Sequence, residues 1–164
     1  MGLKPLKESE SSVMWFHTFN ARGLGDNVKR KLIFDWLKEK HKGIVLLQET
    51  HSVKEREKMW INQWGGNIVF SHGSSNSRGV AILISPDVDF ELKETITDEE
   101  GRVVVLIGNL GVQEFVICNA YSPTKDKPQE QMKFLDNLKK MLLPFLDKDL
   151  LLGGDFNVCT GYIT

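Results

Sequence analysis

The stretch Ile44-Val45-Leu46-Leu47-Gln48-Glu49-Thr50-His51 places four consecutive apolar residues directly before four polar ones. A short, continuous apolar run is typical of a strand that is buried on both faces, as in a sheet covered by helices. The charged segment that follows, 53–64, predicts a helix. The polar residues 48–51 therefore stand where a buried strand ends.

Upstream of this stretch, the sequence predicts a strand and a helix that pack beside it. An apolar and aromatic run covers residues 13–20 and ends before the glycines of segment 21–25, which favour a turn. Asp26 is suited to cap a helix whose one face is apolar and whose other face is basic. The residues predicted to face inward are Val28, Leu32, Ile33, Trp36 and Leu37, and those predicted to face outward are Lys29, Arg30, Lys31 and Lys38.

Downstream, apolar runs separated by turn residues predict a series of further strands. These runs lie near residues 67–71, 79–85, 89–95, 102–110, 114–121 and 149–153. A helix is expected at 128–146, and its predicted inward residues are Met132, Leu135, Leu138, Leu142 and Phe145. Early alternation of strands and helices, followed by adjacent strands, predicts an α/β fold of the α+β kind, with a mixed sheet or two stacked sheets flanked by helices.

Composition indicates one globular domain. The 164 residues are 41% hydrophobic and 26% charged, and we expect the domain at 13–164 after a solvated tail at 1–12. Because 21 Lys and Arg balance 22 Asp and Glu, nucleic-acid affinity would have to come from local patches or a bound metal. Two cysteines, Cys118 and Cys159, make no disulfide framework and favour an intracellular compartment. The apolar runs are too short to cross a bilayer, so we expect no membrane association.

The aromatic and histidine side chains have structural interpretations. Trp15, Trp36, Trp60 and Trp64 fall on apolar faces and are expected in the core rather than stacked on bases. Three histidines lie in a strand, after a helix and in a loop, and these are His17, His41 and His72. We interpret them as structural, since none stands in a motif that would make it catalytic.

Three polar clusters stand where predicted strands end: Asn20, residues 48–51 and residues 154–157. Ligand sites in α/β sheets form at such edges. Hydrolysis of a phosphodiester needs a hard cation, a group that activates water and donors for the phosphoryl oxygens, and Asn20, Glu49, Asp155 and Asn157 are of those types. Taken singly, Glu49 is equally suited to complement a helix dipole, and Asp155 to be a turn carboxylate after two glycines.

Five motifs in order resemble those of the exonuclease, endonuclease and phosphatase superfamily, which has the deoxyribonuclease I-like fold. They are Asn20-Ala21-Arg22-Gly23-Leu24, Leu47-Gln48-Glu49-Thr50-His51, Gly79-Val80-Ala81-Ile82-Leu83, Asn119-Ala120-Tyr121-Ser122-Pro123 and Gly154-Asp155-Phe156-Asn157. The Arg-Gly-Leu, Lys-Arg-Lys and Gln-Glu-Thr-His segments are more similar to endonucleases of non-LTR retrotransposons than to abasic-site endonucleases of DNA repair. The resemblance implies a two-sheet β-sandwich flanked by helices.

The resemblance also implies a Mg²⁺-dependent DNA endonuclease, with Mn²⁺ as an alternative ion. It implies Glu49 as the metal ligand with Asn20 beside it, Tyr121 directed toward the phosphate, Asp155 activating water, and Asn157 orienting the nucleophile or the phosphate. One glutamate can suffice, because Mg²⁺ keeps several coordination sites for water and phosphate oxygens. An ordinary aspartate can act as base, because Mg²⁺ lowers the proton affinity of nearby water.

Arg78 and His51 are the candidates for contacts with the substrate, and the implied partner is double-stranded DNA in the nucleus. In the family, a further aspartate and a late Asp-His pair complete the site from a later segment, whereas this sequence ends at Thr164. We therefore expect a partial domain, incomplete at its C-terminus, with an open sheet edge and weak activity. Two other interpretations stay open: an abasic-site endonuclease or other phosphodiesterase of the same fold, and a non-catalytic fragment or exapted binding module. No sequence feature indicates an oligomeric state.

Overall fold

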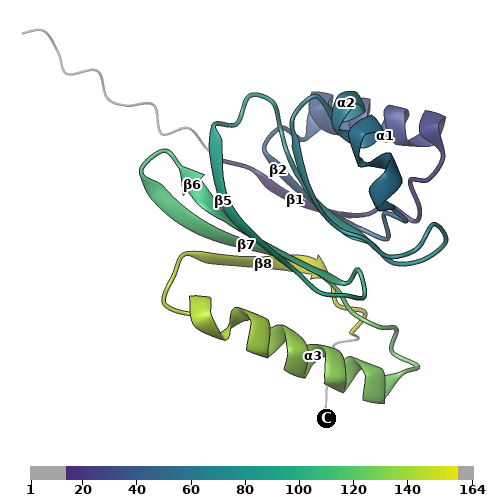
Figure 1. Ribbon diagram of the computed structural model, residues 1–164, viewed down its shortest axis with the longest axis vertical. Coiled ribbons are helices and arrows are strands. Elements are labelled where there is room, and N and C mark those ends of the chain that lie inside the picture. The colour runs from purple at the N-terminus through teal and green to yellow at the C-terminus, as the bar shows by residue number, and fades with distance from the viewer. Residues whose placement is uncertain (1–13, 159–164) are drawn as a thin grey trace, which may run out of the picture.

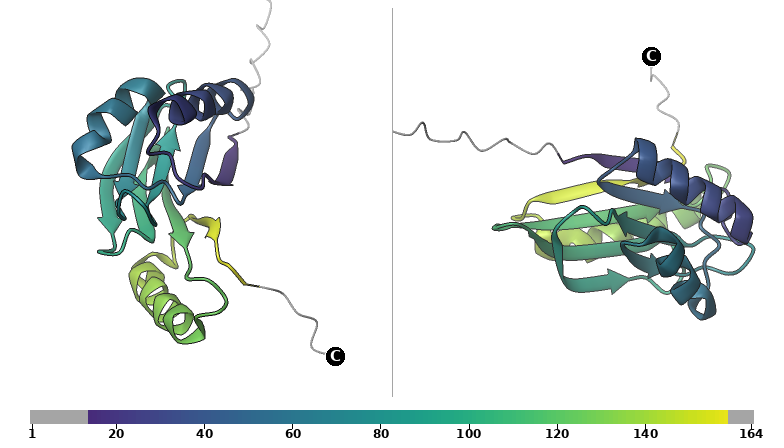
Figure 2. Two further views of the ribbon diagram at one scale, coloured as in Figure 1. Left: turned by 90° about the vertical axis from the view of Figure 1, so that its right-hand side faces the viewer. Right: turned by 90° about the horizontal axis from the view of Figure 1, so that it is seen from above.

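The computed structural model describes residues 14–158 and contains two stacked β-sheets with helices on their outer faces (Figure 1). Views from two further directions show two helices over one sheet and a third helix on the opposite side of the molecule (Figure 2). This architecture confirms the predicted α/β sandwich. The predicted tail at 1–12 and the predicted start of the domain at Val13 lie outside the described residues.

The first sheet has the strand order β1-β2-β4-β3. Its strands are β1 (Phe16–Asn20), β2 (Ile44–Gln48), β3 (Asn67–Ser71) and β4 (Val80–Ile84). β1 and β2 run parallel, whereas β4 runs antiparallel to both of its neighbours. Every residue of β2 and β4 is buried, as expected for strands covered on both faces. The outer face carries α1 (Asn27–Lys40) and α2 (Glu57–Trp64), which follows the short 3-10 helix η1 (Lys54–Arg56).

The second sheet has the strand order β5-β6-β7-β8. Its strands are β5 (Phe90–Thr97), β6 (Val103–Leu110), β7 (Gln113–Tyr121) and β8 (Leu150–Asp155). β7 and β8 run parallel, because α3 (Pro128–Leu142) and the 3-10 helix η2 (Leu143–Phe145) connect them as a crossover. The core-facing residues of α3, Phe134, Leu138 and Leu142, pack on the outer face of this sheet.

The core between the sheets forms from alternate residues of the central strands. In β2, Val45 and Leu47 pack against the helices, while Ile44 and Leu46 pack against the second sheet. The continuous apolar run at 44–47 is therefore required on both sides, and a polar substitution anywhere in it would lie in one hydrophobic layer or the other.

Helix α1 turns a different face to the sheet than the sequence predicts. Its exposed residues include Val28, Leu32 and Trp36, and its buried residues are Arg30, Phe34 and Leu37. Arg30 is buried because its guanidinium donates to Gln63 Oε1 at 2.6 Å and to Leu24 O at 2.9 Å, and lies 4.9 Å from the centre of the Trp60 ring. Arg30 is thus buried with its hydrogen bonds made, although the pattern of apolar and polar residues predicts it to face solvent.

Two other core predictions need correction. In α3, Met132 is 62% exposed and Leu135 40% exposed, because the buried face carries Phe134, one position away from the predicted stripe. Of the tryptophans, Trp60 and Trp64 are buried as predicted. The two that were wrongly predicted as core are Trp15 and Trp36, with 61% and 43% of their surface exposed.

β1 and β8 are the outer strands of their sheets on the same side of the sandwich. Within residues 14–158, β1 pairs only with β2, and β8 pairs only with β7. The two strands contact each other across the sheets. Association of the protein through this edge stays a prediction.

Candidate active site

Four polar side chains from four strand ends meet at one end of the sandwich. Asn20 Nδ2 donates to Glu49 Oε1 at 2.9 Å and to Asp155 Oδ2 at 2.9 Å. The Tyr121 hydroxyl donates to the same Glu49 oxygen at 2.8 Å. The residues Asn20 and Asp155 are 135 positions apart in the sequence, so their contact is a product of the fold.

Strand direction explains why these residues meet. β1 and β2 are parallel with Asn20 opposite Gln48, and β7 and β8 are parallel with Tyr121 opposite Asp155. Each pair therefore ends at the same edge of its sheet, and stacking of the sheets brings the two edges together. The three polar clusters that the sequence places at strand ends thus lie at one end of the sandwich, and their roles in catalysis stay predictions.

The orientation of the Asn20 amide is set by its surroundings. Its Oδ1 accepts a hydrogen bond from Arg22 N at 3.1 Å, and a backbone N–H can only donate. The amide nitrogen must then face the two carboxylates, which only accept. Asn20 thus holds Glu49 and Asp155 next to each other through one NH₂ group.

Glu49 has an uncommon backbone conformation that its neighbours maintain. Its φ is 49°, in the left-handed region that non-glycine residues rarely adopt. The segment is fixed on both sides, since Glu49 O accepts from Gly23 N at 2.7 Å and Thr50 N donates to Gly79 O at 3.0 Å. Strain of this kind persists only where the surrounding structure requires it, and it is typical of functional sites.

Tyr121 is held as a hydrogen-bond donor. Burial, the hydrogen bond to Glu49 and the charge of Glu49 together raise the pKa of Tyr121 to about 12, although the charge of Arg102 lowers it. The phenol is therefore protonated throughout the neutral range. An oxygen of a bound anion could accept the hydrogen bond of the Tyr121 hydroxyl in place of Glu49.

Asp155 and Asn157 form a turn that depends on the preceding glycine. Gly154 has φ 143°, and a Cβ at this position would lie 1.9 Å from Ala120 O, so no other residue fits. Asp155 Oδ1 then accepts from Asn157 N at 3.1 Å, and Asn157 Nδ2 donates to Ser122 O at 2.9 Å. Asn157 is thus bound to the segment that follows Tyr121, next to the other site residues.

Asn119, which the sequence shows only as part of a motif, joins the two sheets. This side chain is fully buried, and its Nδ2 donates to Leu47 O at 2.8 Å and to Ala81 O at 2.9 Å. Its Oδ1 accepts from Gln48 Nε2 at 2.8 Å. One residue of β7 therefore binds β2 and β4 of the other sheet, two positions before Tyr121. A polar residue inside an apolar strand was the available signal.

The predicted substrate contacts border the site. A pocket of about 510 Å³ is lined by Glu49 and Tyr121 together with His51 and Arg78. His51 also packs against Gly23, where a Cβ would lie 2.8 Å from its Nδ1. A larger set of lining residues comes from the β5–β6 turn and the start of α3, and it includes Glu100, Arg102, Pro123, Lys127 and Glu130. Sequence reasoning missed Glu100 and Arg102, because an acid and a base in a turn have no distinctive spacing.

The carboxylates fit a hard cation of the Mg²⁺ type. Within residues 14–158 no cluster of three His, Cys, Asp or Glu side chains forms a closed metal cage. Mg²⁺ needs none, since it is commonly held by one or two carboxylates with water and phosphate oxygens. Among the described residues, both hydrogen bonds to Glu49 end on Oε1, so Oε2 is the atom left for a cation.

The fold and the site together define an α/β sandwich of the nuclease and phosphodiesterase type, with its polar site at the joined strand ends. The chain belongs to the Endonuclease/Exonuclease/phosphatase family, which it matches over residues 17–163. Enzymes of this family generally use divalent metal ions. No helix within the described residues has the length and apolar character needed to span a membrane.

Individual relatives agree with this assignment. The chain is 28% identical over 141 residues to the Transposon TX1 uncharacterized 149 kDa protein of Xenopus laevis, covering 85% of this chain and 11% of that protein. This match agrees with the resemblance to non-LTR retrotransposon endonucleases. An AP endonuclease from Archaeoglobus fulgidus is similar with a TM-score of 0.68 and 26% identity, over 92% of this chain and 60% of that one. The truncated TDP2 of Caenorhabditis elegans shares the fold, with a TM-score of 0.58 and 20% identity, over 81% of this chain and 56% of that one.

Proposed function

We propose that this chain carries the catalytic site of a Mg²⁺-dependent DNA endonuclease that hydrolyses phosphodiester bonds, as in target-site nicking by a retrotransposon. The observation that carries the proposal is the single Asn20 amide that holds Glu49 and Asp155 together, with Tyr121 on the same Glu49 oxygen. Such an arrangement offers a cation ligand, a base and a hydrogen-bond donor within one hydrogen-bonded group of side chains.

In this proposal Glu49 would hold the metal ion, and Asn20 keeps Glu49 in place. The ion, when bound, neutralises the phosphate and stabilises the charge that develops on its oxygens. Mg²⁺ is the ion that this oxygen ligand favours, and Mn²⁺ has similar requirements. Asn20 contributes as a positioning residue, since its amide nitrogen donates to both carboxylates.

The remaining residues divide the work of hydrolysis. Asp155 accepts the proton of a water molecule as this water adds to phosphorus, and each of its oxygens has a lone pair left for this purpose after the bonds from Asn157 N and Asn20. Asn157 orients the nucleophile or the phosphate, and Tyr121 donates to a phosphoryl oxygen. As the water oxygen bonds to phosphorus, the bond between phosphorus and the 3′ oxygen breaks. The 3′ oxygen takes a proton from solvent and becomes a hydroxyl that can prime reverse transcription.

Double-stranded DNA is the proposed substrate because of the relatives. The transposon protein and the AP endonuclease both point to DNA. A retrotransposon nuclease acts on chromosomal DNA, so the proposal carries a nuclear location with it. Cleavage at abasic sites is the second candidate, which the 26% identity to the AP endonuclease favours. The chain spans 11% of the transposon protein and 56–60% of the two structures. A non-catalytic binding module is the third interpretation.

The proposal is tested by nicking of supercoiled plasmid with Mg²⁺ or with EDTA. We expect Mg²⁺-dependent nicking that falls at least about 100-fold in Glu49→Gln and in Asp155→Asn. Glu39→Gln on the exposed surface of α1 is the matched control and should retain full activity. Abasic duplex assayed in parallel separates the second candidate from the first. Equal nicking by wild type and Asp155→Asn would refute the assigned base.

A further inference from the structure

One carboxylate lies between two guanidinium groups at the mouth of the candidate active site. Glu100 Oε2 is 3.5 Å from Arg78 Nη1 and 3.5 Å from Arg102 Nε. Arg102 belongs to the same environment as Tyr121, because its guanidinium carbon lies 5.4 Å from the Tyr121 ring centre and its Nη1 donates to Tyr121 O at 3.2 Å. All four side chains line the pocket that contains Glu49.

Glu100 is a weak partner for both arginines. Charge-assisted hydrogen bonds between nitrogen and a carboxylate are about 2.7–2.9 Å long, and both of these contacts are longer. Glu100 is 59% exposed, and ion pairs of exposed carboxylates contribute little to stability. Arg102 Nε is itself buried and lacks a hydrogen-bond acceptor in the described part of the chain. A buried donor of this kind favours an acceptor that fits better than Glu100 does.

The backbone that carries these residues is rigid. Asp98 accepts hydrogen bonds from the backbone nitrogens of Glu100, Arg102 and Val103, and Ser71 Oγ donates to it at 2.8 Å. The turn is bound to the neighbouring loop through Gly101 O, which accepts from Gly79 N at 2.9 Å. The turn therefore keeps Arg102 next to Tyr121, while the exposed Glu100 side chain is free to move away from the two arginines.

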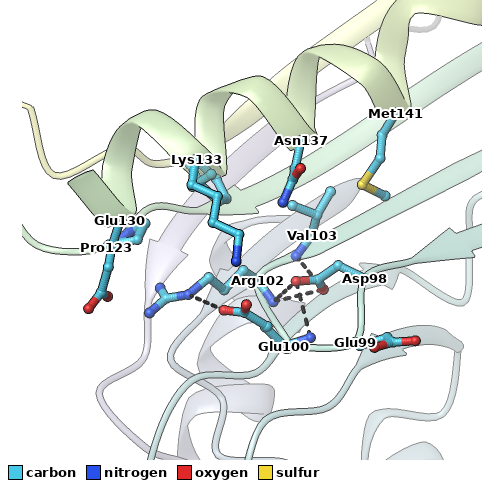
Figure 3. Close-up of a pocket in the computed structure, with 11 residues that line it drawn as sticks. Asp98, Glu99, Glu100, Arg102, Val103, Pro123, Glu130, Lys133, Asn137 and Met141 are labelled. Atoms are coloured by element: carbon cyan, nitrogen blue, oxygen red, sulfur yellow. Dashed lines mark hydrogen bonds and ion pairs between the residues drawn. The ribbon is translucent and has the colours of Figure 1, made fainter. Parts of the chain in front are cut away.

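The space around this pair continues beyond the catalytic pocket. A second pocket of about 490 Å³ also contains Glu100 and Arg102, and it extends along α3 to Lys133 and Asn137. Figure 3 shows Lys133 reaching from α3 into the space above Arg102, with Glu100 on the opposite side. The charged side chains that line this second pocket are of both signs, since Arg102 and Lys133 lie among Asp98, Glu99, Glu100 and Glu130. The position that favours a phosphate is therefore limited to Arg78 and Arg102.

We propose that Arg78 and Arg102 form a subsite for the DNA phosphate next to the one that is cleaved, and that Glu100 is an internal anion which occupies this subsite until DNA displaces it. This inference rests on the proposed function for the identity of the ligand. When Glu100 occupies the subsite, DNA cannot use it. The apparent affinity for DNA is therefore reduced in proportion to the fraction of protein molecules in which Glu100 occupies the subsite. Glu100 therefore reduces binding of isolated anions and favours ligands that supply several phosphates at once.

The first test measures the affinity for a duplex oligonucleotide by fluorescence anisotropy in EDTA, where no cleavage occurs. We expect Glu100→Gln to bind about fivefold more tightly than wild type, which corresponds to about 1 kcal/mol. Glu99→Gln is the matched control, since it removes the same charge from the same turn without an ion pair to Arg78 or Arg102. It should change the affinity less than about twofold, and the difference should shrink as salt rises. Equal affinities of the two variants would overturn the inference.

A second test uses inorganic phosphate and does not depend on DNA. The Nε–H resonance of Arg102, assigned with Arg102→Lys, should shift on titration with phosphate, and the shift should occur at about fivefold lower concentration in Glu100→Gln. An unchanged resonance in both proteins would refute the subsite. If phosphate shifts the resonance but the protein does not bind duplex DNA, the anion subsite stands and the proposed function is rejected. If the wild type nicks DNA but Glu99→Gln and Glu100→Gln bind duplex with the same affinity, the proposed function stands and the subsite is rejected.

Discussion

Replacement of Asn119 by alanine should destabilise the protein by about 3 kcal/mol. The side chain makes three buried hydrogen bonds, to Leu47 O, Ala81 O and Gln48 Nε2. Each typical bond contributes about 0.5–1.5 kcal/mol, and a buried group left without a partner costs about 1–3 kcal/mol. Gln48 keeps other bonds to Thr18 Oγ1 and Leu46 O, so we take a value near the middle of the combined range.

Urea unfolding followed by the fluorescence of the buried Trp60 and Trp64 measures this effect. With a slope of about 2 kcal/mol per molar urea, the midpoint of Asn119→Ala should fall by about 1.5 M. Asn109→Ala on neighbouring β6 is the matched control, because Asn109 donates at the surface to Glu91 and its loss should cost less than about 0.5 kcal/mol. A loss below about 1 kcal/mol for Asn119→Ala would refute the idea that this side chain holds the sheets together.

Two predictions concern a partly buried histidine and a buried cysteine. Burial lowers the pKa of His17, His41 lowers it further, and a backbone hydrogen bond at Lys42 opposes them. The unfolded state then binds a proton at His17 more tightly than the folded state, so this contribution to stability is present above about pH 6.5 and is lost as pH falls. Between about pH 7 and 5, the unfolding free energy of His17→Phe should therefore decline less than that of the wild type. Burial raises the pKa of the Cys118 thiol to about 12. In Cys159→Ser, iodoacetamide at pH 8 should therefore label Cys118 only after unfolding, and labelling of the folded protein would contradict its burial.

The strands could be predicted from the sequence because their signals are local. The run at 44–47 and the turn residues around each strand place β2 and β3 at their observed bounds. The buried face of α1 could not be predicted in the same way. Arg30 is buried only because Gln63 and Trp60 of another helix satisfy it, and the position of α2 is a tertiary fact. A binary pattern assigns arginine to solvent unless its partners are known.

The site could be predicted in part for a related reason. Residues at the ends of parallel strands share an edge, so the positions of Asn20 and Glu49 after two predicted strands place them together, whereas the approach of Asp155 depends on how the two sheets stack. Glu100 and Arg102 differ, since their turn is placed by tertiary contacts: Tyr121 N donates to Arg102 O at 2.8 Å, and Gly79 N donates to Gly101 O at 2.9 Å. A contact between two loops leaves no periodic signal in either loop.

The candidate active site and the hydrophobic core both depend on the hydrogen bonds of Asn119 between the two sheets. Asn20 and Glu49 come from the first sheet, and Tyr121 and Asp155 come from the second. Asn119 lies two positions before Tyr121, and its acceptor Leu47 O lies two positions before Glu49. Residues two positions apart in a strand point to the same face of the sheet. A shift at Asn119 would therefore also move the Tyr121 hydroxyl and change its contact with Glu49. The relative position of the two sheets therefore sets the geometry of the site, and the buried amide of Asn119 fixes this position.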